Sequence, residues 1–220
     1  MEDELQAEEH YRQDRWPASI ALLACVALYI FLPDSLIIKP RWLVPVLELL
    51  PLIPIVITHR RRHPGEPTWT RPLSLILIGV LNVANIVSVT LLVHHLLHHT
   101  SPIDGRHLVY SAILVWVTNV IVFSLWFWEL DRGGPAKRGT HLERHPDFMF
   151  PQMDKPEFAE PHWQPRYMDY LYVALTNSAA FSPTDAMPLT RTAKCLMAMG
   201  SIVSMVTIVV VASRAINILQ

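Results

Sequence analysis

The sequence predicts an all-α polytopic membrane protein with five transmembrane helices and one re-entrant half-helix. Hydrophobic residues make up 51% of the 220-residue chain, and a soluble core of this size needs more polar surface around it. They also gather in long apolar runs, and five of these runs approach the length of about 20 residues that crosses a bilayer as a helix. A sixth apolar run is too short to cross.

The five candidate spans differ in length and in proline content. In chain order they are Pro17 to Pro33, Trp42 to Ile57, Pro72 to Val93, Leu108 to Trp128 and Cys195 to Ala212. About 17 residues is the short limit for a span, so the first two runs are marginal. Only "DSLIIKPR" separates those two, which predicts a tight helical hairpin. Three prolines in the second run predict a kinked helix packed inside the bundle.

The polar segments divide the chain into three regions. Residues 1–15 form an acidic N-terminal tail, residues 16–107 form a three-helix membrane region, and residues 108–220 form a C-terminal module with a surface loop at 131–165. The loop begins at the helix stop "DRGGP". At this stop we expect an interfacial charge cluster of Glu129, Asp131 and Arg132. We also expect the loop to be packed onto the protein by its aromatic residues, which are Phe148, Phe150, Phe158 and Trp163.

The sixth apolar run, Tyr167 to Leu175, lies within "RYMDYLYVALTNSAAF". About ten residues of helix reach only about 15 Å, which is half of a hydrocarbon core. A half-helix persists at membrane depth only where protein or a watery cavity satisfies its backbone. Polar side chains for such a place follow at once: Thr176, Asn177, Ser178, Ser182, Thr184 and Asp185. The run is therefore predicted to be re-entrant.

The tail from Tyr170 to Leu219 resembles the pore module of the tetrameric potassium-channel superfamily, which has an outer helix, a pore half-helix, a filter strand and an inner helix. It is most similar to a bacterial membrane-protein branch with this module and a non-standard filter. The matching residues are "YLYVALT" for the pore helix, Asp185 after the filter, Pro188 and Thr190 before the inner helix, and Gly200 as its hinge. The resemblance implies a tetramer whose fourth span is the outer helix.

The filter itself departs from the potassium pattern. Ser182 and Thr184 occupy the positions of its two glycines, Pro183 replaces the tyrosine, and Phe181 precedes them. Glycines let successive carbonyls face the ion, and none occurs between residues 140 and 199, so a potassium-type filter is not expected. Four copies of "SPTD" around an axis would instead provide rings of hydroxyls and carboxylates, which favour cations. The same residues also fit the cap and first turn of the last helix, and the two roles are compatible.

Four other polar residues lie inside predicted spans. Asn82, Asn85 and Asn119 are expected to hydrogen-bond between helices, as buried amides in membranes usually do. Glu48 lies within the second span, where an acid is costly. It is either functional or paired with a partner near the kink.

The segment "VHHLLHHT" places histidines four residues apart on one helix face, in the pairs His94 with His98 and His95 with His99. This spacing can bind a transition metal. The alternative is an interfacial helix end that carries ordinary imidazoles, because no neighbouring Cys, Asp or Glu completes a tight motif.

Three functions remain open. The first is an oligomeric, tetrameric channel-like protein of a bacterial inner membrane, with the lipid bilayer and itself as partners and a permeant ion of unknown identity. The second is a non-conducting membrane scaffold with a sealed axis, and the third is a histidine-based metal-binding membrane protein. No phosphate loop, Ser-His-Asp order or H-E-x-x-H sequence predicts an enzyme. No cofactor is expected, and a net charge of −1 predicts no nucleic-acid partner.

Two rules disagree about orientation. Most Lys and Arg residues flank the spans on the side of the N-terminus and of the half-helix, which places that side in the cytoplasm. The potassium-channel topology implied by the resemblance places the half-helix outside.

Overall fold

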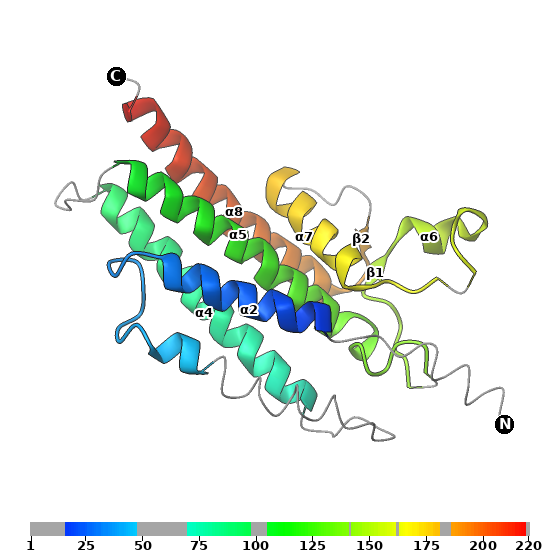
Figure 1. Cartoon of the computed structure of the whole chain (residues 1–220). Coiled ribbons are helices and arrows are strands. Elements are labelled where there is room, and N and C mark those ends of the chain that lie inside the picture. Colours follow the sequence, from blue (N-terminus) through cyan, green and yellow to red (C-terminus); the bar gives the residue numbers. More distant parts are fainter. Residues whose placement is uncertain are drawn as a thin grey trace.

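The computed structural model describes residues 16–47, 70–97, 105–140, 142–161, 163–180 and 186–218. The fold over these residues is mostly helical (Figure 1). The longer helices are α2 (Trp16–Phe31), α4 (Thr70–Leu97), α5 (Gly105–Leu130), α7 (Tyr167–Ala180) and α8 (Arg191–Ile218). The short elements are η1 (Asp131–Gly133), β1 (Phe148–Met149), α6 (Pro151–Asp154), η2 (Pro156–Phe158) and β2 (Met187–Pro188).

Among the described residues, three helices are long and apolar enough to cross a membrane. They cover Thr70–Leu97, His107–Gly133 and Arg191–Ser213, and they coincide with the third, fourth and fifth expected spans. Helix α2 has 16 residues, about 24 Å at 1.5 Å per residue, so its role as a span stays a prediction. Most of the second expected span, with Glu48, lies outside the described residues.

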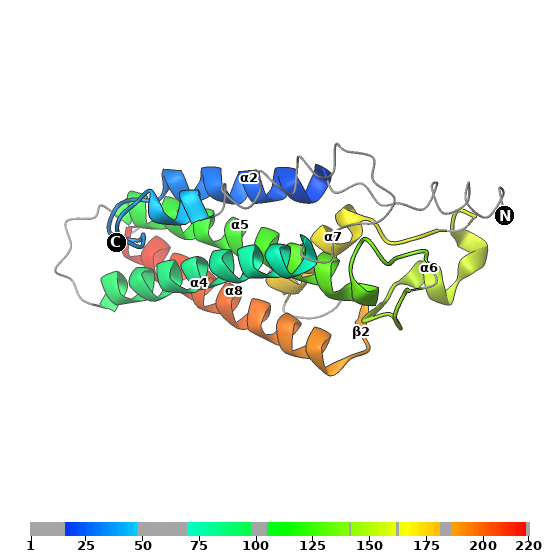
Figure 2. The ribbon, with the colours of Figure 1, turned by 90° about the horizontal axis from the view of Figure 1, so that it is seen from below.

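Helix α5 is the centre of the bundle. It packs against α2, α4, α7 and α8, and Figure 2 shows α2 and α8 on opposite sides of it. Its most apolar window is 61% buried, whereas the corresponding window of α8 is only 28% buried. Helix α8 therefore presents most of its apolar surface outward.

Buried amides join three of these helices. The Asn119 side chain on α5 donates from Nδ2 to the Gly200 carbonyl at 3.1 Å and to Ser204 Oγ at 2.9 Å on α8. Asn85 on α4 donates to Asn119 Oδ1 at 3.3 Å. Asn82 is also buried. Such bonds matter in lipid because no water is present to replace them.

Gly200 permits a close approach between α5 and α8. A Cβ atom at this position would lie 3.1 Å from the ring of Phe123, and α8 continues as a helix through it. Because glycine has no side chain, the Phe123 ring can pack directly on the backbone of α8. This packing explains the glycine without the hinge role that the resemblance implies.

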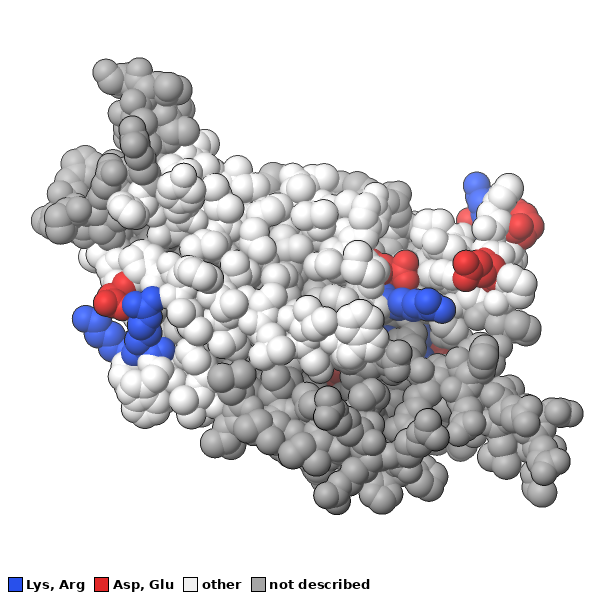
Figure 3. Space-filling model, viewed as in Figure 1, with Lys and Arg blue, Asp and Glu red and all other residues white. Residues whose placement is uncertain are grey.

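Charged side chains gather at the two ends of the bundle on the face drawn in Figure 3, and the surface between them carries none in the described residues. At one end, Arg41 closes the segment after α2 by donating to the carbonyls of Ile30 and Leu32 and to Asp34. At the other end lies the cap, which we define as residues 131–166 together with β2. The uncharged middle surface is apolar and exposed, as expected of a lipid-facing belt.

The cap is more ordered than the single extended loop that the sequence predicted. It contains η1, α6 and η2, and β1 pairs antiparallel with β2, with Phe148 opposite Pro188. Phe148 and Phe150 are buried as expected, and the Phe150 ring packs against Trp163 with centroids 5.7 Å apart. The expectation for Phe158 was wrong, because its side chain is 82% exposed at the end of η2.

Candidate functional site

Helix α7 lies where the sequence predicted a half-helix, and its start and the strand that follows it lie at the same end of the bundle. It begins at the cap and runs back beside α5 and α8, whereas β2 lies again at the cap beside β1 (Figure 1). Its 14 residues give a length of about 21 Å.

Local sequence explains why α7 begins at Tyr167. Pro165 precedes the helix, and the Asp169 carboxylate accepts a hydrogen bond from the Arg166 N–H at 2.6 Å. An acid in the first turn that bonds back to the N-terminal backbone is half of a capping box. The Tyr167 ring then stacks edge-on against Trp128 with centroids 6.1 Å apart, and its hydroxyl lies 2.7 Å from Ser124 Oγ on α5. These contacts fix the first turn against the end of α5.

Besides the Tyr167 contact, two polar clusters hold α7, and one of them is the outer anchor, formed by Asp131, Arg138 and Tyr170. Asp131 follows α5 directly and is fully buried. Its carboxylate accepts hydrogen bonds from the Tyr170 hydroxyl at 2.5 Å and from the backbone N–H groups of Asp147 at 2.7 Å and Phe148 at 3.3 Å. Burial raises the pKa of Tyr170 well above its ordinary value, so the proton stays on the tyrosine, which is the donor.

Arg138 supplies the buried cation of the outer anchor. Its guanidinium lies over the Tyr170 ring at 4.8 Å from the centroid and near the Trp128 ring at 5.7 Å. It also donates to the Trp128 carbonyl and, at 3.4 Å, to the Asp131 carbonyl. A buried charge is tolerated only when it is paired and hydrogen-bonded. Arg138 therefore ties the end of α5 to the first turns of α7.

Arg132 extends this cluster into the cap. Its Nη1 donates to Glu143 Oε1 at 2.6 Å, and its Nε lies 3.7 Å from Asp131 Oδ2. The chain turns sharply here, because Arg132 has φ 55° and two glycines with positive φ follow it.

The charges expected to cluster at this helix end are buried within the protein, and their position at a membrane interface stays a prediction. Glu129, Asp131 and Arg132 are all buried, because the cap and α7 fold over them. The sequence did not reveal Arg138 and Tyr170 as the partners of Asp131. One feature of the sequence could have indicated these contacts. Several arginines follow "ELD", directly after the aromatic end of the fourth predicted span, and such a density of arginines is unusual there.

The second polar cluster is the inner anchor, formed by Asn177, Met197 and Ser201. Asn177 in the last turn of α7 donates from Nδ2 to the Met197 carbonyl at 2.9 Å. Ser201 Oγ donates to Asn177 Oδ1 at 3.1 Å and lies 3.3 Å from the Asn177 carbonyl. The amide is buried, so all its bonds are to protein. The polar end of α7 is thus fixed against the middle of α8.

The remaining filter candidates are only partly described. Thr176 bonds back to its own helix at the Tyr172 carbonyl, 2.9 Å away. Ser178 is buried, and its hydroxyl has no hydrogen-bond partner among the described residues. Phe181, Ser182, Pro183, Thr184 and Asp185 lie outside the described residues.

The histidines do not form a cluster in the part of the chain that the structure describes. His95 Nε2 lies 3.3 Å from the Ser35 carbonyl oxygen. The His94 ring lies edge-on to the His95 ring. His98 and His99 lie outside the described residues. No group of three or more His, Cys, Asp or Glu side chains able to hold a metal occurs among the described residues.

Comparison with known proteins adds no relative. No protein family, curated protein or solved structure matches this chain.

Proposed function

We propose that this protein is an oligomeric, channel-like membrane protein in which α7 is a re-entrant half-helix and residues 181–185 face a shared axis. The observation that carries the proposal is the inner anchor. A helix that begins at the cap has its polar last turn bonded to Met197 and Ser201, inside a helix long and apolar enough to cross a membrane.

The depth of this contact supports a half-crossing. Helix α8 begins at Arg191, and Ser201 follows ten residues later. At about 1.5 Å per residue the contact lies about 15 Å along the helix, which is near the middle of a hydrocarbon core of about 30 Å. Helix α7 is too short to continue to the other side, and β2 returns to the cap.

The chemistry at this depth fits an ion or water path. The last turns of α7 carry hydroxyl and amide groups, from Thr176, Asn177 and Ser178. The Ser178 hydroxyl makes no hydrogen bond to any of the described residues, so it can still donate one. Irregular or polar backbone is stable at this depth only beside protein or a water-filled cavity. Cations are the favoured permeant species because Asp185 follows, and a ring of carboxylates selects for positive charge.

The exposed side of α7 supports assembly with further copies. Met168, Tyr172 and Leu175 lie one turn apart on one face and are exposed in the isolated subunit. The same face continues to Ala179 and Ala180, which are also exposed, so an apolar surface lies uncovered along the whole length of α7. A neighbouring subunit would cover it, as in the tetrameric arrangement that the resemblance to the potassium-channel pore module implies.

The test is cation flux in liposomes that contain the purified full-length protein, with subunit number measured on the same sample. We expect Na⁺ or K⁺ flux from an oligomer, reduced by Asp185→Asn and altered by Ser182→Ala. Asp154→Asn is the matched control, because Asp154 is an exposed acid of the cap. A monomer whose flux is equal to that of empty liposomes would contradict the proposal.

One observation favours a second candidate, a non-conducting scaffold. Ala179 and Ala180 at the end of α7 are apolar and exposed, and four copies of them could seal an axis. An oligomer without flux would identify this function.

The third candidate function is a histidine-based metal-binding membrane protein. Elemental analysis of the purified protein tests it, because absence of zinc and copper would exclude a histidine metal site.

A further inference from the structure

We propose that Arg191 and Lys194, at the start of α8, bind the phosphate of an anionic phospholipid whose acyl chain lies along the exposed face of the same helix. The partner is thus an anionic lipid surface. The proposal does not depend on whether the protein conducts ions.

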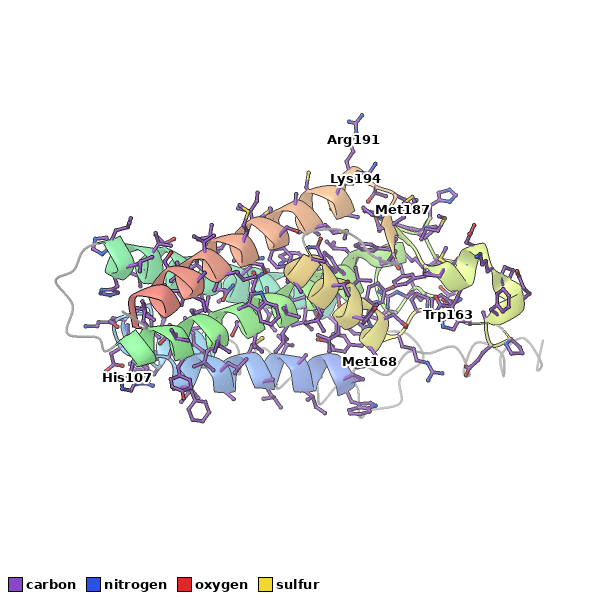
Figure 4. The ribbon with its side chains drawn as sticks, turned by 90° about the horizontal axis from the view of Figure 1, so that it is seen from above. His107, Trp163, Met168, Met187, Arg191 and Lys194 are labelled. Carbon is purple, nitrogen blue, oxygen red and sulfur yellow. The ribbon has the colours of Figure 1, made fainter. Side chains whose placement is uncertain are left out.

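The two cations are exposed and project away from the bundle. Figure 4 shows both side chains leaving the first turn of α8 on the side away from the rest of the helices. Neither has a hydrogen bond or an ion pair from its side chain to any of the described residues, and the first turn of α8 contains no acid. Cations near a helix N-terminus are disfavoured by the helix dipole. A bound anion would offset that repulsion.

The backbone of this helix end is already partly satisfied and is not itself the proposed site. Thr190 caps the helix, because its Oγ1 accepts a hydrogen bond from the Ala193 N–H at 3.2 Å. The Thr190 hydroxyl also lies 2.5 Å from Asp147 Oδ1. The available positive charge therefore comes from the two side chains.

Below the cations the same helix face is apolar and exposed. Residues that follow Arg191 at intervals of three and four are uncharged and exposed down the helix: Cys195, Ala198, Ile202, Met205 and Val209. Nearby, Met187 and Leu189 are also exposed at the cap end. Two cations above a continuous apolar stripe match the shape of one phospholipid, with its headgroup at the interface and its chain along the helix.

Orientation follows from this assignment. Anionic lipids are concentrated in the cytoplasmic leaflet, so the site places the cap and the start of α7 on the cytoplasmic side. This agrees with the distribution of Lys and Arg and is opposite to the topology implied by the potassium-channel resemblance.

The test is a thermal-unfolding titration of the full-length protein in micelles, followed by tryptophan fluorescence. The probes are phosphatidylglycerol, phosphatidylcholine with the same acyl chains, and inorganic phosphate. We expect only phosphatidylglycerol to raise the melting temperature. In the variant Arg191→Gln with Lys194→Gln, its apparent affinity should fall by about 25-fold, since each cation near an anionic surface contributes about fivefold.

The matched control is Lys39→Gln with Lys155→Gln, which removes two exposed cations elsewhere and should leave the titration unchanged. Without lipid, the control should melt as the parent does, and the Arg191 and Lys194 variant should melt at the same temperature or slightly higher, because it loses charges that the helix dipole disfavours. If the Arg191 and Lys194 variant melts at a lower temperature than the parent without lipid, the two cations pair with groups of the protein itself, and the proposal is overturned. An equal response to phosphatidylcholine or to free phosphate, or an unchanged titration in that variant, would also overturn it.

Discussion

The Tyr170 hydroxyl donates a hydrogen bond to the buried Asp131 carboxylate at 2.5 Å and thereby joins the end of α5 to the first turns of α7. The two residues are 39 positions apart in the chain, so the bond fixes a tertiary arrangement. Among the described residues, the carboxylate accepts two further hydrogen bonds, from the N–H groups of Asp147 and Phe148.

Removal of this donor should destabilise the protein. Tyr170→Phe keeps the ring in contact with Phe148, Phe150 and Arg138 but leaves the carboxylate with one donor fewer. We expect a loss of about 1.5–3 kcal/mol, which is typical of a hydrogen bond to a charged group. Thermal or denaturant unfolding in micelles measures it. Tyr110→Phe is the control, because Tyr110 is an exposed residue of α5; equal stability of the two variants would contradict the role of Tyr170.

The charges of the outer anchor should be energetically coupled. Arg138 is a cation near the Asp131 carboxylate and donates to the Asp131 backbone carbonyl. Asp131→Asn and Arg138→Gln should each cost about 1.5–3 kcal/mol, because each removes charge-assisted hydrogen bonds from a buried site. The double variant should lose less than the sum, with a coupling of about 0.5–3 kcal/mol. A double-mutant cycle of unfolding free energies gives this value. Strict additivity would show that the two side chains act independently.

Two glycines inside long helices, Gly200 and Gly79, should respond differently to alanine. In Gly200→Ala the new methyl group would meet the Phe123 ring at 3.1 Å, and overpacking of this kind costs about 1–3 kcal/mol. Gly79→Ala is the matched control, since nothing lies within 4 Å of its Cβ position. It should be neutral, or stabilising by up to about 1 kcal/mol through helix propensity. Unfolding in micelles distinguishes the two, and a destabilising effect confined to Gly79→Ala would refute the packing role of Gly200.

The sequence predicted the parts of this fold that depend on continuous local pattern. The apolar runs of α4, α5 and α8 are long enough to be recognised without their neighbours. The outer anchor could not be recognised in this way, because Glu129, Asp131 and Arg132 resemble ordinary charges at a helix end until the cap folds over them. The partners of Asp131, which are Arg138 and Tyr170, come close to it only through tertiary packing.

The candidate site could also be predicted only where it depends on local sequence. The short length of the run after Tyr167 indicated a helix that cannot cross, and α7 has the expected position in the chain. The partners of Asn177 could not be predicted, because they depend on where α7 lies along α8. The exposure of Phe158 was also missed, since an aromatic residue in a proline-rich loop gives no local sign of the side it faces.

The inner anchor should affect function separately from stability. Asn177→Ala and Asn119→Ala each remove a buried amide that bonds to α8, and each should cost about 0.6–1.7 kcal/mol. Only Asn177→Ala releases the polar end of α7, so only this variant should change liposome flux at matched protein density. Equal changes in flux would show that the effect follows from stability alone.

The central claim is that α7 enters and leaves the bundle at the same side of the membrane. Single cysteines at Glu160, Met187 and Lys39, in a background with Cys25→Ser and Cys195→Ser, can be labelled by a membrane-impermeant maleimide in vesicles of known orientation. We expect positions 160 and 187 to react from one side, the cytoplasmic one, and position 39 to react from the other. Labelling of positions 160 and 187 from opposite sides would mean that α7 crosses the membrane, and it would contradict the account.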